Sequence, residues 1–181
     1  MTIDTQNNYL MITASGEDKV GIVDLISGKI ADCGGNIEES RMAVLGEQFA
    51  LIMLIAGPWN ALSRLEGQME SLGDQLGLTI IQKRTRKRKQ TKPAVPYVVE
   101  VVAMDHPGIV RSLSTFFSRK GINIEELKTD TYPAPYTGTA MFSVVMTVGI
   151  GADVHIPALR ESFLDYCDEL NLDASFEPVR L

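Results

Sequence analysis

The apolar residues of the chain follow two spacings, one typical of strands and one typical of helices. In the first half, short apolar runs predict four strands, over residues 8–14, 37–44, 49–55 and 78–82. Between them, apolar residues three and four positions apart predict two amphipathic helices, over residues 20–33 and from residues 57–60 to Leu76. The first half therefore has the predicted order βαββαβ.

The second half repeats this order. Strands are expected over residues 97–103, 124–131 and 141–148. The apolar stripes of its two helices are Ile109, Leu113, Phe116 and Phe117, and then Ile156, Leu159, Phe163, Tyr166 and Leu170. Asn171 stands where the first half has Gly77, and both residue types accept the left-handed conformation that ends a helix.

Two local features of the first half are also predicted. Residues 15–17 (Ser-Gly-Glu) are expected to form a turn after the first strand. The run 49–55 is continuously apolar, so both faces of that strand are expected to be covered.

Two motifs occur twice at one offset. Asp18-Lys19-Val20-Gly21-Ile22-Val23 returns as Asp105-His106-Pro107-Gly108-Ile109-Val110, and Gly-x-Asn-Ile-Glu-Glu occurs at residues 34–39 and 121–126. The offset is 87 residues for both motifs. A shared offset of two separate motifs indicates an internal duplication.

The chain of 181 residues is therefore predicted to hold two small domains. We expect residues 1–86 and 97–181 to be the domains and residues 87–96 to link them. The fold class is α+β, with two ferredoxin-like βαββαβ units, each an antiparallel sheet with two helices on one face. The free edges of the sheets could join copies into a homo-oligomer.

Composition narrows the class of protein. No stretch approaches the roughly 18 apolar residues of a membrane span, and the N-terminus is polar, so a cytoplasmic protein without membrane contact is expected. The two cysteines, Cys33 and Cys167, fall on apolar helix faces and are expected in the cores. Metal-ligand spacing is absent, and no metal or cofactor is predicted.

Each half resembles an ACT domain, the small ligand-sensing module of amino-acid metabolism. The residues that carry the resemblance are Asp18, Gly21, Asn36 and Ile37, and then Asp105, Pro107, Gly108, Asn123 and Ile124. Two such domains and nothing else, at this length, resemble the glycine cleavage system transcriptional repressor group. The loop also looks like the ACT segment of formyltetrahydrofolate deformylase, whose catalytic domain this sequence lacks.

The resemblance implies a binding protein rather than an enzyme. It implies that a small amino acid, glycine in particular, is sensed and that transcription is regulated through a LysR-type activator protein. It implies no direct sequence-specific DNA binding. A stand-alone regulatory subunit of an amino-acid enzyme is an alternative.

The repeated loop suggests where a ligand would bind. The N-terminus of a helix attracts an anion such as an amino-acid carboxylate, and glycine lets the ligand approach the backbone. Asp18 or Asp105 could hold the ammonium group, and Asn36 and Asn123 are expected to enter the second strand beside the loop. The full predicted ligand set is Asp18, Gly21, Ile22, Asn36, Ile37, Asp105, His106, Gly108, Ile109, Asn123 and Ile124.

A structural explanation of the same residues stays open. An aspartate just before a helix commonly caps it, and Pro107 would suit a first helical turn. The two loops have diverged, since His106 stands where the first half has Lys19, so one half could be structural only.

Catalysis finds little support in the sequence. Glu38-Glu39 and Glu125-Glu126 are adjacent in predicted strands, so their side chains should point to opposite faces. His106 and His155 have no nucleophile in an elbow or triad context. No catalytic residue is predicted.

A basic run and a long loop are candidate partner contacts. Residues 83–96 hold seven basic and no acidic residues, namely Lys83, Arg84, Arg86, Lys87, Arg88, Lys89 and Lys92. A solvated linker, a protein contact or a sequence-independent nucleic-acid contact would each fit. The loop from Tyr132 to Gly138 is longer than its counterpart and is expected to expose Tyr132 and Tyr136.

Overall fold

The computed structural model describes residues 8–86 and 94–179. The chain divides into two compact units, residues 1–88 and residues 89–181. Within the described residues, no helix is long and apolar enough to span a membrane.

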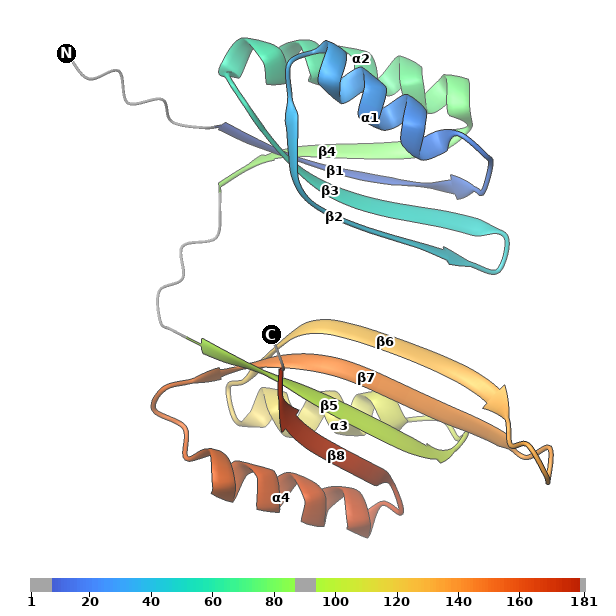
Figure 1. Cartoon of the computed structure of the whole chain (residues 1–181), viewed down its shortest axis with the longest axis vertical. Coiled ribbons are helices and arrows are strands. Elements are labelled where there is room, and N and C mark those ends of the chain that lie inside the picture. The colour runs from blue at the N-terminus through green and yellow to red at the C-terminus, as the bar shows by residue number, and fades with distance from the viewer. Residues whose placement is uncertain (1–7, 87–93, 180–181) are drawn as a thin grey trace. The chain divides into compact units, whose positions relative to one another are not determined.

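The first unit is an antiparallel sheet with both helices on one face (Figure 1). Its elements are β1 (Asn8–Glu17), α1 (Ile22–Asp32), β2 (Asn36–Leu45), β3 (Gln48–Gly57), α2 (Trp59–Leu76) and β4 (Leu78–Thr85). The strand order in the sheet is β2-β3-β1-β4. This is the ferredoxin-like arrangement expected from the sequence.

The second unit has the same topology. Its elements are β5 (Ala94–Met104), α3 (Ile109–Arg119), β6 (Asn123–Pro133), β7 (Ala140–Gly151), α4 (Ile156–Glu169) and β8 (Asp173–Pro178). The strand order is β6-β7-β5-β8, and α3 and α4 again lie on one face of the sheet (Figure 1). The duplicated α+β fold is confirmed.

The helical stripes form the two cores. Those of α1 and α3 are buried throughout: Ile22, Ile26, Ile30 and Cys33 in the first unit, and Ile109, Leu113, Phe116 and Phe117 in the second. The strand β3 alternates instead, with Phe49, Leu51 and Met53 buried and Ile52 exposed. The prediction that both faces of this strand are covered is wrong, because the helices cover only one face of the sheet.

Three strands are longer than their sequence patterns indicated. β1 continues through the predicted turn at residues 15–17, because these residues pair with residues 48–50 of β3. β4 continues to Thr85, so Lys83 and Arg84 belong to a strand rather than to a bridge between the units. β5 begins at Ala94 and pairs there with Gly151 of β7, so residues 94–96 of the predicted linker are in the sheet. The rest of that linker, residues 87–93, lies outside the described residues.

The helix ends agree with the predicted caps. Gly77 after α2 has φ 69°, and Asn171 after α4 has φ 56°, the one non-glycine residue of the described chain with positive φ. Both residues have the left-handed conformation that commonly ends a helix. Glycine adopts it without steric strain, and asparagine adopts it with little.

The second repeated motif encodes a β-bulge. The pairing of β2 with β3 shifts between Ile37 and Glu39, and the pairing of β6 with β7 shifts between Ile124 and Glu126. Glu38 and Glu125 are thus the extra residues of two equivalent bulges. The strict alternation of faces expected for the adjacent glutamates therefore does not apply there.

Both cysteines are free and buried, as expected for core residues. Burial, with the nearby Asp168 carboxylate, raises the pKa of the Cys167 thiol to about 12. An unfolded chain ionises this thiol near its ordinary pKa of 9.0, whereas the folded unit does not. The thiol therefore contributes stability below pH 9 that is lost as the pH rises from about 9 to about 12.

We expect the free energy of unfolding of the second unit to fall with pH above 9 more steeply in the native chain than in a Cys167→Ala variant. Urea unfolding at pH 8, 9 and 10 measures the difference. Equal pH slopes in the two proteins would show that the thiol ionises as easily in the folded unit as in the unfolded chain.

Candidate functional site

The loop between the first strand and the first helix, β1–α1 in the first unit and β5–α3 in the second, is hydrogen-bonded to the neighbouring hairpin. In the first unit the Asp18 N–H donates to the Glu47 carbonyl oxygen at 3.1 Å. In the second unit the Asp105 N–H donates to the Ala140 carbonyl oxygen at 2.9 Å. The predicted ligand loop therefore has a fixed backbone position at one end of each sheet.

Glycine, not aspartate, is the N-cap of the first helix in both units. Gly21 has φ 95° and Gly108 has φ 103°, and no side chain hydrogen-bonds to either helix start. The alternative that Asp18 and Asp105 cap these helices is therefore wrong. Pro107 precedes the cap residue rather than standing in the first turn.

The space beside both glycines is open. No described atom beyond the adjacent residues lies within 4 Å of the position that a Cβ on Gly21 or Gly108 would occupy. The first regular helical bonds run from Leu25 N–H to the Gly21 oxygen at 3.0 Å and from Ser112 N–H to the Gly108 oxygen at 2.9 Å. In α1 the Ile22 N–H already donates to the Lys19 oxygen at 3.5 Å, so only the next two amides are available to an anion, whereas the helix leaves the amides of the first turn of α3 without acceptors.

The two loops differ in charge. The first turn of α1 contains Asp24, whereas that of α3 contains no acidic residue and includes Arg111. Lys19 forms an exposed ion pair with Glu17 at 3.4 Å, and the His106 Nδ1 lies 3.2 Å from the Pro107 carbonyl oxygen. A carboxylate is therefore attracted more strongly to the start of α3 than to the start of α1.

Asn36 and Asn123 lie at the opposite end of the sheet from the loops. Asn36 pairs with Ala56 of β3, whereas the loop follows Glu17, which pairs with Gln48. The eight residue steps along β3 from Gln48 to Ala56 span roughly 27 Å. The expectation that the asparagines enter their strands beside the loops is wrong, because β2 and β6 begin where α1 and α3 end (Figure 1).

The predicted isoleucines belong to the cores. Ile22 and Ile109 are buried, and Ile37 and Ile124 are partly buried against the same clusters. Ile109 could therefore meet a ligand only through its backbone amide, whereas the Ile22 amide already donates to the Lys19 oxygen. The structure brings together Asp18 with Gly21, and Asp105 with His106 and Gly108.

Replacing Gly21 or Gly108 by alanine should lower the free energy of unfolding by about 1 kcal/mol, because each has a left-handed φ that alanine adopts with strain. Because the space beside each glycine is open, no clash adds to this loss. Urea unfolding measures it. Gly67→Ala, in the middle of α2 and equally unobstructed, is the control and should not destabilise the protein. Equal effects at all three positions would contradict the conformational argument.

The candidate partner residues fall in different places. Arg84 is engaged by α2, since its guanidinium donates two hydrogen bonds of 2.7 Å to the Glu66 carboxylate. Lys83 and Arg86 are exposed, and Lys87, Arg88, Lys89 and Lys92 lie outside the described residues. Tyr132 and Tyr136 are both exposed, as expected, at the end of the second unit that holds the Asp105 loop.

The described residues contain no cluster of three potential metal ligands. His155 is a helix cap, since its Nδ1 accepts a hydrogen bond from the Ala158 N–H at 3.3 Å. Neither observation assigns a catalytic role to a residue of the chain.

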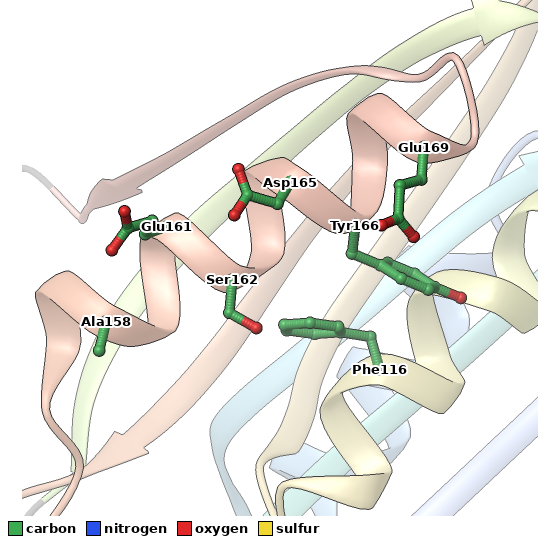
Figure 2. Close-up of a pocket in the computed structure, with 7 residues that line it drawn as sticks. All are labelled: Phe116, Ala158, Glu161, Ser162, Asp165, Tyr166 and Glu169. Carbon is green, nitrogen blue, oxygen red and sulfur yellow. The ribbon is translucent and has the colours of Figure 1, made fainter.

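A groove that the sequence did not indicate lies between α3 and α4. Figure 2 shows Ser162 and Tyr166 of α4 on the side of Phe116 of α3, with carboxylates along α4. The groove has a volume of about 410 Å³ and is lined by Phe116, Ala158, Glu161, Ser162, Asp165, Tyr166 and Glu169. None of these residues belongs to the predicted ligand set.

Known proteins resemble the chain over nearly its whole length. The profile of the ACT domain family matches residues 8–82. The glycine cleavage system transcriptional repressor of Escherichia coli strain K12 is 36% identical over 179 residues, which are 99% of this chain and 94% of that protein.

Two solved structures share the fold of the whole chain. One, described as a candidate glycine cleavage system transcriptional repressor, has a TM-score of 0.73 at 27% identity and covers 97% of this chain and 99% of its own. The other, a protein of unknown function from Galdieria sulphuraria, has a TM-score of 0.78 at 28% identity and covers 96% and 99%.

Proposed function

The chain belongs to the family of the glycine cleavage system transcriptional repressor, and on that basis we propose that it senses a small amino acid and regulates transcription of glycine cleavage through a protein partner. The observation that carries the sensing role is the start of the first helix in each unit. The N-cap there is a glycine, and no side chain hydrogen-bonds to the helix start. Backbone amides in the first turn are therefore open to an anion, and the space beside the glycine is unobstructed. The role is regulatory rather than enzymatic.

In this proposal the ligand's carboxylate binds the first-turn amides of α1 or α3. Its ammonium group is attracted to the Asp18 or Asp105 carboxylate of the adjoining loop. Glycine fits the space best, because a ligand without a side chain needs no further pocket. Asn36 and Asn123 are not part of this contact set, because they lie at the other end of their units.

The second unit is proposed to bind the ligand more tightly. The carboxylate of Asp24 opposes an anion at α1, while Arg111 supports one at α3. His106 adds a ring nitrogen that can donate a hydrogen bond near the same loop.

Isothermal titration calorimetry with glycine, serine and alanine tests the sensing role. We expect saturable binding of glycine, weakened roughly tenfold or more by Asp105→Asn and less by Asp18→Asn, because a charged hydrogen-bonding partner is lost. A protein with a native melting curve that gives no binding signal with any of the three amino acids would refute it.

The proposed partner is a LysR-type activator protein, and glycine is expected to strengthen its complex with the chain. The alternative is that the basic run binds nucleic acid. Arg84 would contribute little to such binding, because its charge is already paired with Glu66. Binding of the purified chain alone to operator DNA would favour that alternative. Stable co-purification with an amino-acid enzyme would favour a regulatory subunit.

A further inference from the structure

A row of three large side chains, two of them exposed and one half-buried, crosses the second sheet beside the Asp105 loop. Met104 of β5 pairs with Met141 of β7, and Met141 pairs with Tyr132 of β6. Their neighbour Ala103 is buried on the helix side, so the row lies on the face that α3 and α4 leave uncovered. Met104 is 67% exposed and Tyr132 is 38% exposed.

The β6–β7 loop, next to this row, is closed by backbone hydrogen bonds and exposes a tyrosine. The Ala134 N–H donates to the Thr139 oxygen at 2.8 Å, and the Gly138 N–H donates to the Ala134 oxygen at 2.9 Å. Tyr136, inside this closed loop, is fully exposed at 101%. Tyrosine is enriched among the residues that anchor protein interfaces, and an exposed tyrosine offers a large contact area to a partner.

The first unit provides an internal comparison. Met104 precedes the Asp105 loop as Glu17 precedes the Asp18 loop, and Glu17 pairs with Gln48, which pairs with Leu45. The three equivalent positions thus hold two polar residues and Leu45 in the first unit, but two methionines and a tyrosine in the second. The fold does not need apolar residues there, so a contact outside the unit explains them better.

Carboxylates surround the row on the same face. Asp130 precedes Tyr132 by two residues on β6, and Asp173 of β8 pairs with Val102 of β5, two residues before Met104. Glu100 lies further along the same face, and Lys128 is the one cation of β6 in the described structure. A complementary surface would have an apolar centre and a basic rim.

We propose that Met104, Met141 and Tyr132, together with Tyr136, form the surface that binds the protein partner, and that the partner meets it with an apolar patch rimmed by lysine or arginine. This inference rests on the proposed function, which requires such a partner. The Asp105 N–H bond to the Ala140 oxygen joins the ligand loop to the residue before Met141, so ligand and partner would bind adjacent backbone.

Surface plasmon resonance with the purified LysR-type activator tests the surface in the full chain. The double variant Met104→Gln, Tyr136→Ser should weaken binding roughly tenfold or more, as loss of interface anchors does. Leu45→Gln, which removes an exposed apolar residue at the corresponding end of the first unit, should change the affinity less than twofold. Calorimetry should show that glycine binds all three proteins equally.

Salt provides a second readout. Affinity for the activator should fall between 50 and 300 mM NaCl, and Asp130→Asn should reduce that dependence. If the double variant keeps the wild-type melting temperature and binds the activator as tightly as the wild type, the proposed surface is wrong. The proposed function would not be affected by that result. Failure of the wild-type chain to bind the activator would overturn the proposed partner and this inference together.

Discussion

Replacing Phe163 by alanine should lower the free energy of unfolding of the second unit by about 3–5 kcal/mol. Phe163 is fully buried, and its ring lies 5.2 Å from the rings of Phe116 and Phe117 and 5.8 Å from that of Phe176. Alanine would leave a cavity among rings that cannot move into it without losing their own contacts. Urea unfolding followed by far-ultraviolet circular dichroism should show an early transition for this unit.

Leu164→Ala is the matched control, because Leu164 is the next residue of α4 and only partly buried. It should lower stability by on the order of 1 kcal/mol. Trp59, the single tryptophan, lies in α2 of the first unit and reports that unit separately by fluorescence. Comparable losses for Phe163→Ala and Leu164→Ala would show that the ring cluster is not the centre of the second core.

Replacing Arg84 by alanine should destabilise the first unit by about 1–2 kcal/mol. The guanidinium holds Glu66 in a two-point ion pair and donates a further bond of 3.0 Å to Ser63, which fastens β4 to α2. Solvent screens part of the pair, since both side chains are 33% exposed, so the loss stays below that of a fully buried pair. Thermal unfolding at 50 and 500 mM NaCl measures the loss and its screening.

Lys83→Ala provides the control within the same basic run. Lys83 is exposed and lies next to Arg84 on β4, so its loss should change stability by less than about 0.5 kcal/mol. If the two variants were equally stable, Arg84 would be a solvated cation like its neighbour, and the run could again be treated as one charged segment.

Local sequence was sufficient to predict the order of helices and strands and the residues that end α2 and α4. The helical stripes that end in Cys33 and Phe117 have the three- and four-residue spacing that only a helix buries on one side. Gly77 and Asn171 identified helix ends because few other residues accept their backbone conformation. Duplication reinforced both inferences, since each pattern occurs twice.

Spatial neighbours were harder to predict, because strand pairing joins residues distant in sequence. Asn36 follows α1 in the chain, yet pairing with Ala56 places it at the far end of the unit from Asp18. The N-cap of α1 is Gly21, in a left-handed conformation, and not Asp18. The spacing of residues before the helix could not show which of the two is the cap. The bulge at Glu38 likewise became visible only in the register with β3.

The most direct test of amino-acid sensing at these helix starts is a glycine titration followed by the backbone amide resonances of the full chain. We expect saturable shifts at the first turn of α3, Val110 and Arg111 above all, and weaker shifts at Val23 and Asp24 of α1. The amides at the starts of α2 and α4 should not move. Shifts confined to the groove between α3 and α4, or no shift at all at millimolar glycine, would contradict the account.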